Sequence, residues 1–109
     1  MKFSFKSISA SIQVAAVFNE MYCGKPVTIK DLSDSTGLSV SYLEQIFARF
    51  RKAGIVTSVR GPGGGYHLGK IDLTVSDIIR AVSGGNANFL APVFVALDSV
   101  KISEIKAAA

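Results

Sequence analysis

The sequence of 109 residues predicts a mostly helical fold with one small β-hairpin. The prediction depends on three observations in residues 39–70. Apolar residues at helical spacing end at Gly54, where a left-handed C-terminal glycine belongs. The mostly β-branched run 55–59 is typical of a strand, and residues 66–68 return as a second strand after a glycine-rich turn. This order of elements predicts a winged helix-turn-helix, and we expect a C-terminal dimerisation helix to complete it.

The helix before the wing is expected over residues 41–53. Its predicted core stripe consists of Leu43, Ile46, Phe47 and Phe50, at helical spacing. Ser41 with Glu44 three residues later fits a capping box, and Ser39 is a competing N-cap. Glu44 has a second possible role as an acceptor for cytosine N4.

Two helices are expected before this one. Residues 6–22 form the first, with an apolar stripe wide enough for burial on more than one side. After a turn at 24–26, Thr28 caps a short helix over 29–35, which Gly37 ends. Two short helices joined by a glycine-containing turn form a helix-turn-helix unit, and a generic αα-hairpin is the alternative.

The segments after the wing are a fourth helix and a less regular C-terminal region. Thr74 and Asp77 cap the fourth helix, and Gly84 with Gly85 stops it. The apolar residues within 89–100 predict a dimerisation helix, with a helix folded back on its own core as the alternative. We expect one compact unit: a winged helix-turn-helix domain over 1–84 and a short dimerisation segment over 85–109.

Positive charge is concentrated in one stretch of the chain. The formal net charge is +4, and residues 49–70 carry five basic side chains and no acidic one. These five are Arg49, Arg51, Lys52, Arg60 and Lys70. A positive field on a helix end and a hairpin suits a phosphate backbone, whereas a solvated basic face is the simpler alternative.

The run SYLEQIFARFRKAGIVTSVRGPGGGYHLGK, residues 41–70, closely resembles the Rrf2 family of bacterial transcriptional regulators. The family writes this segment as SYLEQ, then RKAG, then V-RG-x-GGGY, and a looser resemblance extends from Met1 to about Gly84. The resemblance implies a cytoplasmic regulator, expected to be a repressor, that binds double-stranded DNA. A homodimer on a near-palindromic operator would fit a helix-turn-helix protein.

The expected DNA contacts come from the helix start, the basic helix end and the wing. Ser41 and Gln45 have the chemistry to read base edges, and Arg60 at the wing tip suits a narrow minor groove. Glycines there permit positive φ and leave no side chain to block the backbone. The full set of candidates is Lys6, Ser39, Ser41, Tyr42, Gln45, Arg49, Arg51, Lys52, Arg60, Gly61 and Gly63.

Many members of the family carry three cysteines before the dimerisation helix, and these hold an iron–sulfur cluster. The corresponding interval here, residues 83–88, contains no cysteine, and the chain has a single one, Cys23. We therefore expect no metal and no cofactor. Cys23 is interpreted as a small buried residue, with a redox switch as the alternative. A small molecule or a protein remains open as effector.

Other functional classes find little support in the sequence. The glycine run at 61–65 lacks the Lys-Ser/Thr of a nucleotide-binding loop and precedes a strand rather than a helix. His67 is the only histidine, and no serine, histidine and acid form a catalytic pattern, so we expect no enzyme. We also expect no secretory signal and no membrane span. The remaining alternative is a winged-helix interaction module that has lost sequence-specific DNA binding.

Overall fold

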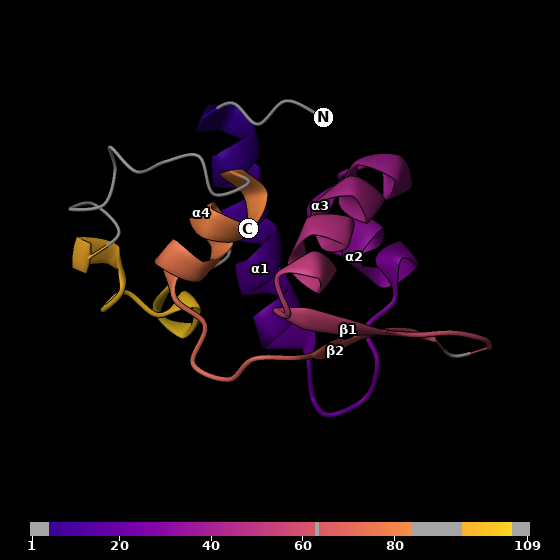
Figure 1. Cartoon of the computed structure of the whole chain (residues 1–109). Helices are drawn as coiled ribbons and strands as arrows, with labels where there is room; N and C mark the ends of the chain where they lie inside the picture. The colour runs from indigo at the N-terminus through magenta and orange to yellow at the C-terminus, as the bar shows by residue number, and fades with distance from the viewer. Residues whose placement is uncertain (1–4, 63, 84–94, 106–109) are drawn as a thin grey trace.

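The computed structural model describes residues 5–62, 64–83 and 95–105 (Figure 1). The elements are, in chain order, α1 (Phe5–Met21), α2 (Ile29–Thr36), α3 (Val40–Lys52), β1 (Val56–Val59), β2 (Gly65–Leu68), α4 (Val75–Ser83) and the 3₁₀ helix η2 (Ile102–Glu104). A mostly helical chain with one antiparallel hairpin confirms the predicted winged helix-turn-helix.

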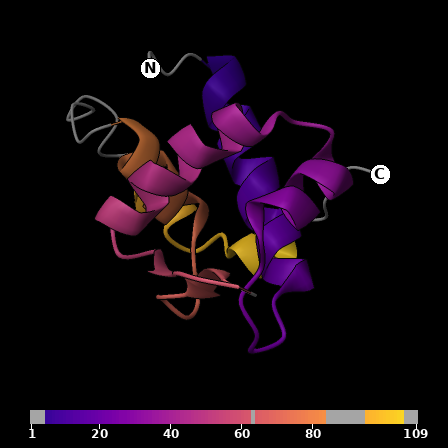
Figure 2. The same ribbon diagram turned by 90° about the vertical axis from the view of Figure 1, so that its right-hand side faces the viewer.

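Helix α1 runs through the middle of the molecule and contacts α2, α4 and η2 (Figures 1 and 2). Val14, Ala15, Ala16 and Phe18 are buried along it. The wide apolar stripe is explained by this position, because neighbours on several sides cover the helix. Within the described residues, no helix combines the length and apolar character needed to cross a membrane.

The helix-turn-helix unit is held by side-chain caps. Thr28 Oγ1 accepts a hydrogen bond from the Asp31 amide at 3.0 Å, and Gly37 ends α2 with φ of 75°. Ser39 caps α3, because its Oγ accepts from the Tyr42 amide at 3.1 Å. The predicted cap at Ser41 is therefore wrong: Ser41 lies inside the first turn.

The register of α3 follows from the apolar residues beside its cap. With Ser39 as N-cap, Leu38 precedes the cap and Leu43 stands at the fourth helical position, the pair that forms a hydrophobic staple. Leu43 is fully buried, and Leu38 packs on the same core. Glu44 lies beyond the third helical position, so it cannot complete a capping box.

The C-terminal end of α3 is closed by the predicted glycine. Gly54 has φ of 79°, and its amide donates to Arg51 O at 3.0 Å. The amide of Ile55 donates to Phe50 O at 2.9 Å. These two bonds form a Schellman motif, which turns the chain directly into β1.

The wing is a hairpin joined to a third, single-residue strand. β1 and β2 are antiparallel, with Val56 opposite Leu68 and Val59 opposite Gly65. Val27, from the turn between α1 and α2, pairs with Tyr66: its amide donates to Tyr66 O at 2.9 Å, and the Tyr66 amide donates to Val27 O at 2.8 Å. The prediction of a plain turn at 24–26 missed this bridge, which ties the wing to the helical body.

The hydrophobic core joins every helix to the wing. Phe47 on α3 is at its centre, with ring centroids 5.6 Å from Phe18, 5.3 Å from Phe50 and 4.7 Å from Tyr66. Tyr66 belongs to β2, so the aromatic cluster fastens the base of the wing to α1 and α3. Packing of this kind fixes the orientation of α3 relative to the hairpin.

The described part of the C-terminal region, residues 95–105, packs on the same core. The Val75 amide donates to Val100 O at 2.9 Å, and the Ile102 amide donates to Leu73 O at 2.7 Å. Ile102 is buried, and the short terminal helix is the three-residue η2. The predicted Gly84 stop and the first half of the predicted dimerisation helix fall within 84–94, outside the described residues, so the dimerisation segment and the domain boundary stay predictions.

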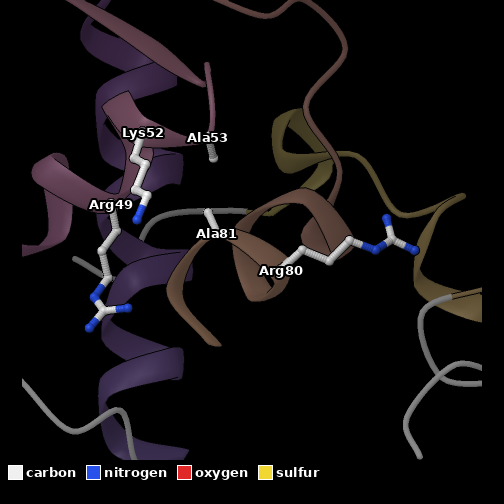
Figure 3. Close-up of a pocket in the computed structure, with 5 residues that line it drawn as sticks. All are labelled: Arg49, Lys52, Ala53, Arg80 and Ala81. Atoms are coloured by element: carbon white, nitrogen blue, oxygen red, sulfur yellow. The ribbon is translucent and has the colours of Figure 1, made fainter. Parts of the chain in front are cut away.

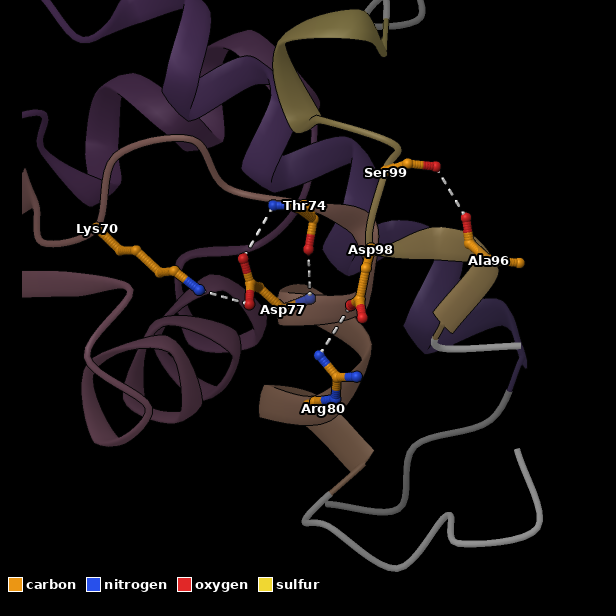
Figure 4. A network of polar contacts seen from close by, with 7 residues as sticks. All are labelled: Lys70, Thr74, Asp77, Arg80, Ala96, Asp98 and Ser99. Atoms are coloured by element: carbon orange, nitrogen blue, oxygen red, sulfur yellow. Dashed lines mark hydrogen bonds and ion pairs between the residues drawn. The ribbon is translucent and has the colours of Figure 1, made fainter. Parts of the chain in front are cut away.

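Asp77 forms the centre of a polar network at the start of α4 (Figure 4). Thr74 and Asp77 bond reciprocally, with Thr74 N to Asp77 Oδ2 at 3.0 Å and Asp77 N to Thr74 Oγ1 at 3.2 Å, as the predicted cap requires. Lys70 Nζ lies 2.7 Å from Asp77 Oδ1. Burial acts to raise the pKa of Asp77, but the bond and charge of Lys70 and the bonds from Thr74 outweigh it and hold that pKa below its ordinary value.

We expect Asp77→Asn to lower the free energy of unfolding at pH 7 by about 1 kcal/mol, since asparagine keeps an acceptor and loses the charge. Because the folded-state pKa of Asp77 is depressed, its stabilisation is complete above the usual carboxyl range near pH 4 and disappears as pH falls through and below it. Urea unfolding at pH 7 and pH 3 measures this difference.

The matched control is Asp34→Asn on α2. Lys30 and Asp34 form an i,i+4 pair at 3.4 Å, but the two side chains are 83% and 68% exposed. Exposed pairs contribute little, so this variant should match the wild-type protein at both pH values. Equal behaviour of Asp77→Asn and Asp34→Asn would contradict the role given to the Lys70–Asp77 bond.

Candidate nucleic-acid interface

The start of α3 presents polar side chains to solvent. Ser41 and Gln45 are exposed, and Tyr42 is half-buried against the core. The hydroxyl of Ser39 accepts the capping bond from the Tyr42 amide with one lone pair, so its O–H is still available as a donor. The wing tip and the start of α3 lie on the same side of the molecule, on the right of Figure 1 and toward the viewer in Figure 2.

The wing tip is a tight glycine turn that carries Arg60. Gly61 has φ of 95°, and the Gly64 amide donates to Gly61 O at 2.8 Å, which closes the turn. Arg60 is exposed directly after β1, next to the half-exposed Val59. Gly63, also predicted for the interface, lies outside the described residues.

The five basic residues of the stretch 49–70 have different surroundings. Arg51, Lys52 and Arg60 are exposed. Arg49 is partly buried, and its Nη1 donates to Val82 O at 3.4 Å, so it links α3 to the C-terminal end of α4. Lys70 is bonded to Asp77. The charge count of the sequence therefore overstates the positive field that is open to a ligand.

A pocket of about 220 Å³ lies between the C-terminal ends of α3 and α4 (Figure 3). Its lining residues are Arg49, Lys52, Ala53, Arg80 and Ala81. Arg80 extends away from the other two cations in Figure 3 and pairs with Asp98 at 3.1 Å. The three cations consequently do not converge on one anion.

Lys6 lies at the start of α1 and is exposed. Figures 1 and 2 both place the start of α1 at the same end of the molecule as the start of α3. A phosphate contact by Lys6 is compatible with this position. His67, the only histidine, is half-buried on the wing, where its Nδ1 lies 3.0 Å from the Tyr22 hydroxyl. This contact fixes the wing against the end of α1 and gives His67 a packing role.

Cys23 is exposed in the turn after α1, so its interpretation as a small buried residue is wrong. The turn carries it out of the core because α1 ends at Met21. A redox role stays an untested prediction.

The residues present do not fit an iron–sulfur cluster. The 109-residue sequence includes only one cysteine and one histidine. Thiolate ligation of an iron–sulfur cluster uses several cysteines. In the described ranges 5–62, 64–83 and 95–105, no group of three histidine, cysteine or acidic side chains lies close enough to hold a metal ion.

Sequence reasoning missed one exposed residue of this surface, Val40. It is the first residue of α3, and the residue is 46% exposed. Helical spacing from Leu43 and Phe47 suggests a buried position, because residues three and four apart share a face. Leu38 and Tyr42 pack on the core on either side of Val40, however, whereas Val40 itself stays exposed to solvent.

Comparison with known proteins agrees with this geometry. The family model Rrf2, described as an iron-dependent transcriptional regulator, matches residues 6–105. The HTH-type transcriptional regulator IscR of Photobacterium profundum is 58% identical over 59 residues, which are 52% of this chain and 34% of that protein. IscR of Escherichia coli is 56% identical over 59 residues, 52% of this chain and 36% of that protein. The matched region thus spans about a third of these curated relatives.

Solved structures give the same result over more of the chain. IscR of T. potens has a TM-score of 0.71 at 32% identity, over 94% of this chain and 83% of that one. CymR, the global cysteine regulator of B. subtilis, has a TM-score of 0.73 at 27% identity, over 94% of this chain and 93% of that one. These relatives are transcription regulators, in agreement with the prediction that the chain is not an enzyme. With a family model covering nearly its whole length, the chain belongs to the Rrf2 family of transcriptional regulators.

Proposed function

We propose that this protein is a DNA-binding transcriptional regulator, a repressor, that binds a near-palindromic operator as a homodimer. The observation that supports this most is the common orientation of the exposed start of α3 and the glycine wing with Arg60. The relatives' description as HTH-type transcriptional regulators supports the same function. Cytoplasmic localisation follows from this proposal, since the operator is in the cytoplasm of a bacterium.

In the proposed complex, the start of α3 enters the major groove and the wing tip enters the adjacent minor groove. Ser41 and Gln45 then face base edges, where serine bonds a donor or an acceptor and glutamine pairs with adenine N6 and N7. Tyr42 and the Ser39 hydroxyl are placed for phosphate contacts. Such contacts position the protein on the duplex without reading its sequence.

Charge determines how strongly this complex depends on salt. Arg51 and Lys52 at the end of α3, Arg60 on the wing and Lys6 on α1 are exposed cations for phosphate. Arg49 contributes to this field while its Nη1 bonds to Val82 O, a contact that links α3 to α4. Each neutralised phosphate releases counterions, which makes the affinity fall steeply as salt rises.

A homodimer would present two identical copies of α3 and would therefore bind a palindromic operator. Two copies of α3 must lie about one helical turn apart, roughly 34 Å, to enter successive major grooves. We assign dimerisation to the segment 85–109. Within it, residues 95–105 contact α4 and the core of their own protomer, so this part of the segment is held in place on its own subunit.

Selection from a random-sequence DNA pool at two salt concentrations tests the proposed function. We expect enrichment of a palindromic motif whose half-sites are one helical turn apart, with weaker binding at the higher salt concentration. A motif without symmetry would refute the homodimer on a palindrome. If the pool shows no binding at either concentration, the chain is an interaction module rather than a DNA-binding regulator.

Gln45→Ala should relax the sequence preference at one base position of each half-site, with a loss of roughly fivefold to a hundredfold on the preferred base, the 1–3 kcal/mol of a bidentate contact. Gln45 is exposed, so the fold should be unchanged. Repeating the selection with the variant measures this effect. An identical motif from both proteins would exclude Gln45 as a base-reading residue.

A further inference from the structure

Four large hydrophobic side chains are exposed among the described residues, and one of them lies at the start of α3. Val40 is 46% exposed although the core face of the same helix, formed by Leu43, Ile46 and their neighbours, is fully buried. Val40 has no part in the hydrophobic staple, which Leu38 and Leu43 provide on either side of the cap. Helix propensity does not explain it either, because valine is a weak helix former.

The neighbours of Val40 are polar and exposed. Ser39 precedes it and Ser41 follows it, and Glu44 lies one turn further along the helix. Val40 therefore presents an isolated pair of methyl groups within a hydrogen-bonding surface. An apolar side chain in the first turn of such a helix lies where base edges are contacted in the major groove.

Thymine is the base that such a side chain recognises. In the major groove, thymine presents one acceptor and the C5-methyl group, and the methyl group is matched by an apolar contact. Serine and glutamine on this surface read donors and acceptors, so Val40 supplies the apolar part of the recognition. We propose that Val40 contacts the 5-methyl group of one thymine in each half-site and is a specificity-determining residue. This inference depends on the proposed DNA-binding function.

Replacement of thymine by deoxyuridine removes the methyl group and changes no hydrogen-bonding atom in the major groove. The probe is the duplex most enriched from the random pool, together with copies in which one symmetric pair of thymines at a time is replaced. We expect wild-type protein to lose roughly three- to fivefold per half-site at one thymine position, the value of one buried methyl group. Equilibrium binding at one fixed salt concentration measures it.

Val40→Ala should bind the unsubstituted duplex more weakly and show no further loss from deoxyuridine at that position. Val40→Ser is a second variant with the same expectation, so the result does not depend on the stability of either one. Ile71→Ala removes more exposed apolar surface, from the loop between β2 and α4, because Ile71 is 78% exposed, and it should respond to deoxyuridine like wild type.

The outcomes separate the inference from the proposed function. Loss of the methyl effect in both Val40 variants, but not in Ile71→Ala, supports the contact. A wild-type protein indifferent to every deoxyuridine, or Val40 variants as sensitive as wild type, overturns the contact while DNA binding stands. Absence of an enriched duplex for the wild-type protein overturns both.

Discussion

Gly65→Ala is expected to lower the free energy of unfolding by roughly 2–4 kcal/mol, from backbone strain and weakened backbone hydrogen bonds. Gly65 has φ of 153° and begins β2 opposite Val59. A Cβ at this position would overlap the carbonyl group of Val27 and approach the amide of Thr28. The chain would have to separate Val27 from Tyr66, and these two residues exchange the hydrogen bonds that attach the wing.

Gly61→Ala is the matched control for this prediction. Gly61 also has positive φ, 95°, but a Cβ there would meet no atom within 4 Å. Gly61→Ala should lower the free energy of unfolding by about 1–2 kcal/mol, the strain of placing alanine at positive φ. Urea unfolding compares the two variants, and amide hydrogen exchange at Val27 and Tyr66 reports the attachment of the wing. Faster exchange in both variants, with equal losses of stability, would contradict a specific contact at Gly65.

Arg60→Ala is expected to weaken operator binding by roughly tenfold to a hundredfold, the range of a specifying arginine contact. Arg60 is the exposed cation beside the glycine turn of the wing, and the turn lets the backbone approach the duplex closely. The loss should be largest on sites with a narrow A·T-rich minor groove, because the negative potential there attracts arginine. Binding isotherms on two operators that differ only in groove width measure it.

Two variants define what Arg60 contributes. Arg60→Lys keeps the charge and loses the guanidinium group, so it should restore phosphate attraction without the groove preference. Lys25→Ala removes an exposed cation from the turn between α1 and α2, at none of the positions assigned to the interface, and should bind like wild type. If Arg60→Ala loses equal affinity on both operators, the residue positions the wing on phosphate and does not specify sequence.

Several elements of the fold follow directly from short sequence patterns. Thr28 and Gly37 bound α2, Gly54 follows α3, and Thr74 with Asp77 caps α4, as their residue types predict. Caps and left-handed glycines are local, because each bond joins residues a few positions apart. The one local error, Ser41 instead of Ser39, arose where two serines competed and packing of Leu38 and Leu43 decided between them.

The candidate interface was only partly predictable. Exposure of Ser41, Gln45, Arg51 and Arg60 agrees with the sequence prediction. The engagement of Arg49 with Val82 and of Lys70 with Asp77 does not appear in a charge count, because each pairing requires that separate elements pack together. Val40 lies one residue before the helix start predicted at Ser41, and only the structure shows that it belongs to α3 and is exposed.

The sequence by itself determined the order of helices and strands, all of their caps except that of α3, the family resemblance and the stretch that carries the positive charge. These depend on residue type and spacing over a few positions. Only the tertiary structure decided that Val27 exchanges hydrogen bonds with Tyr66 of the wing, 39 positions later in the sequence. It also decided that residues 95–105 return to the core. Only it decided which cations remain open to a ligand. Contacts between distant segments are selected by packing of the whole core, and no local pattern records them.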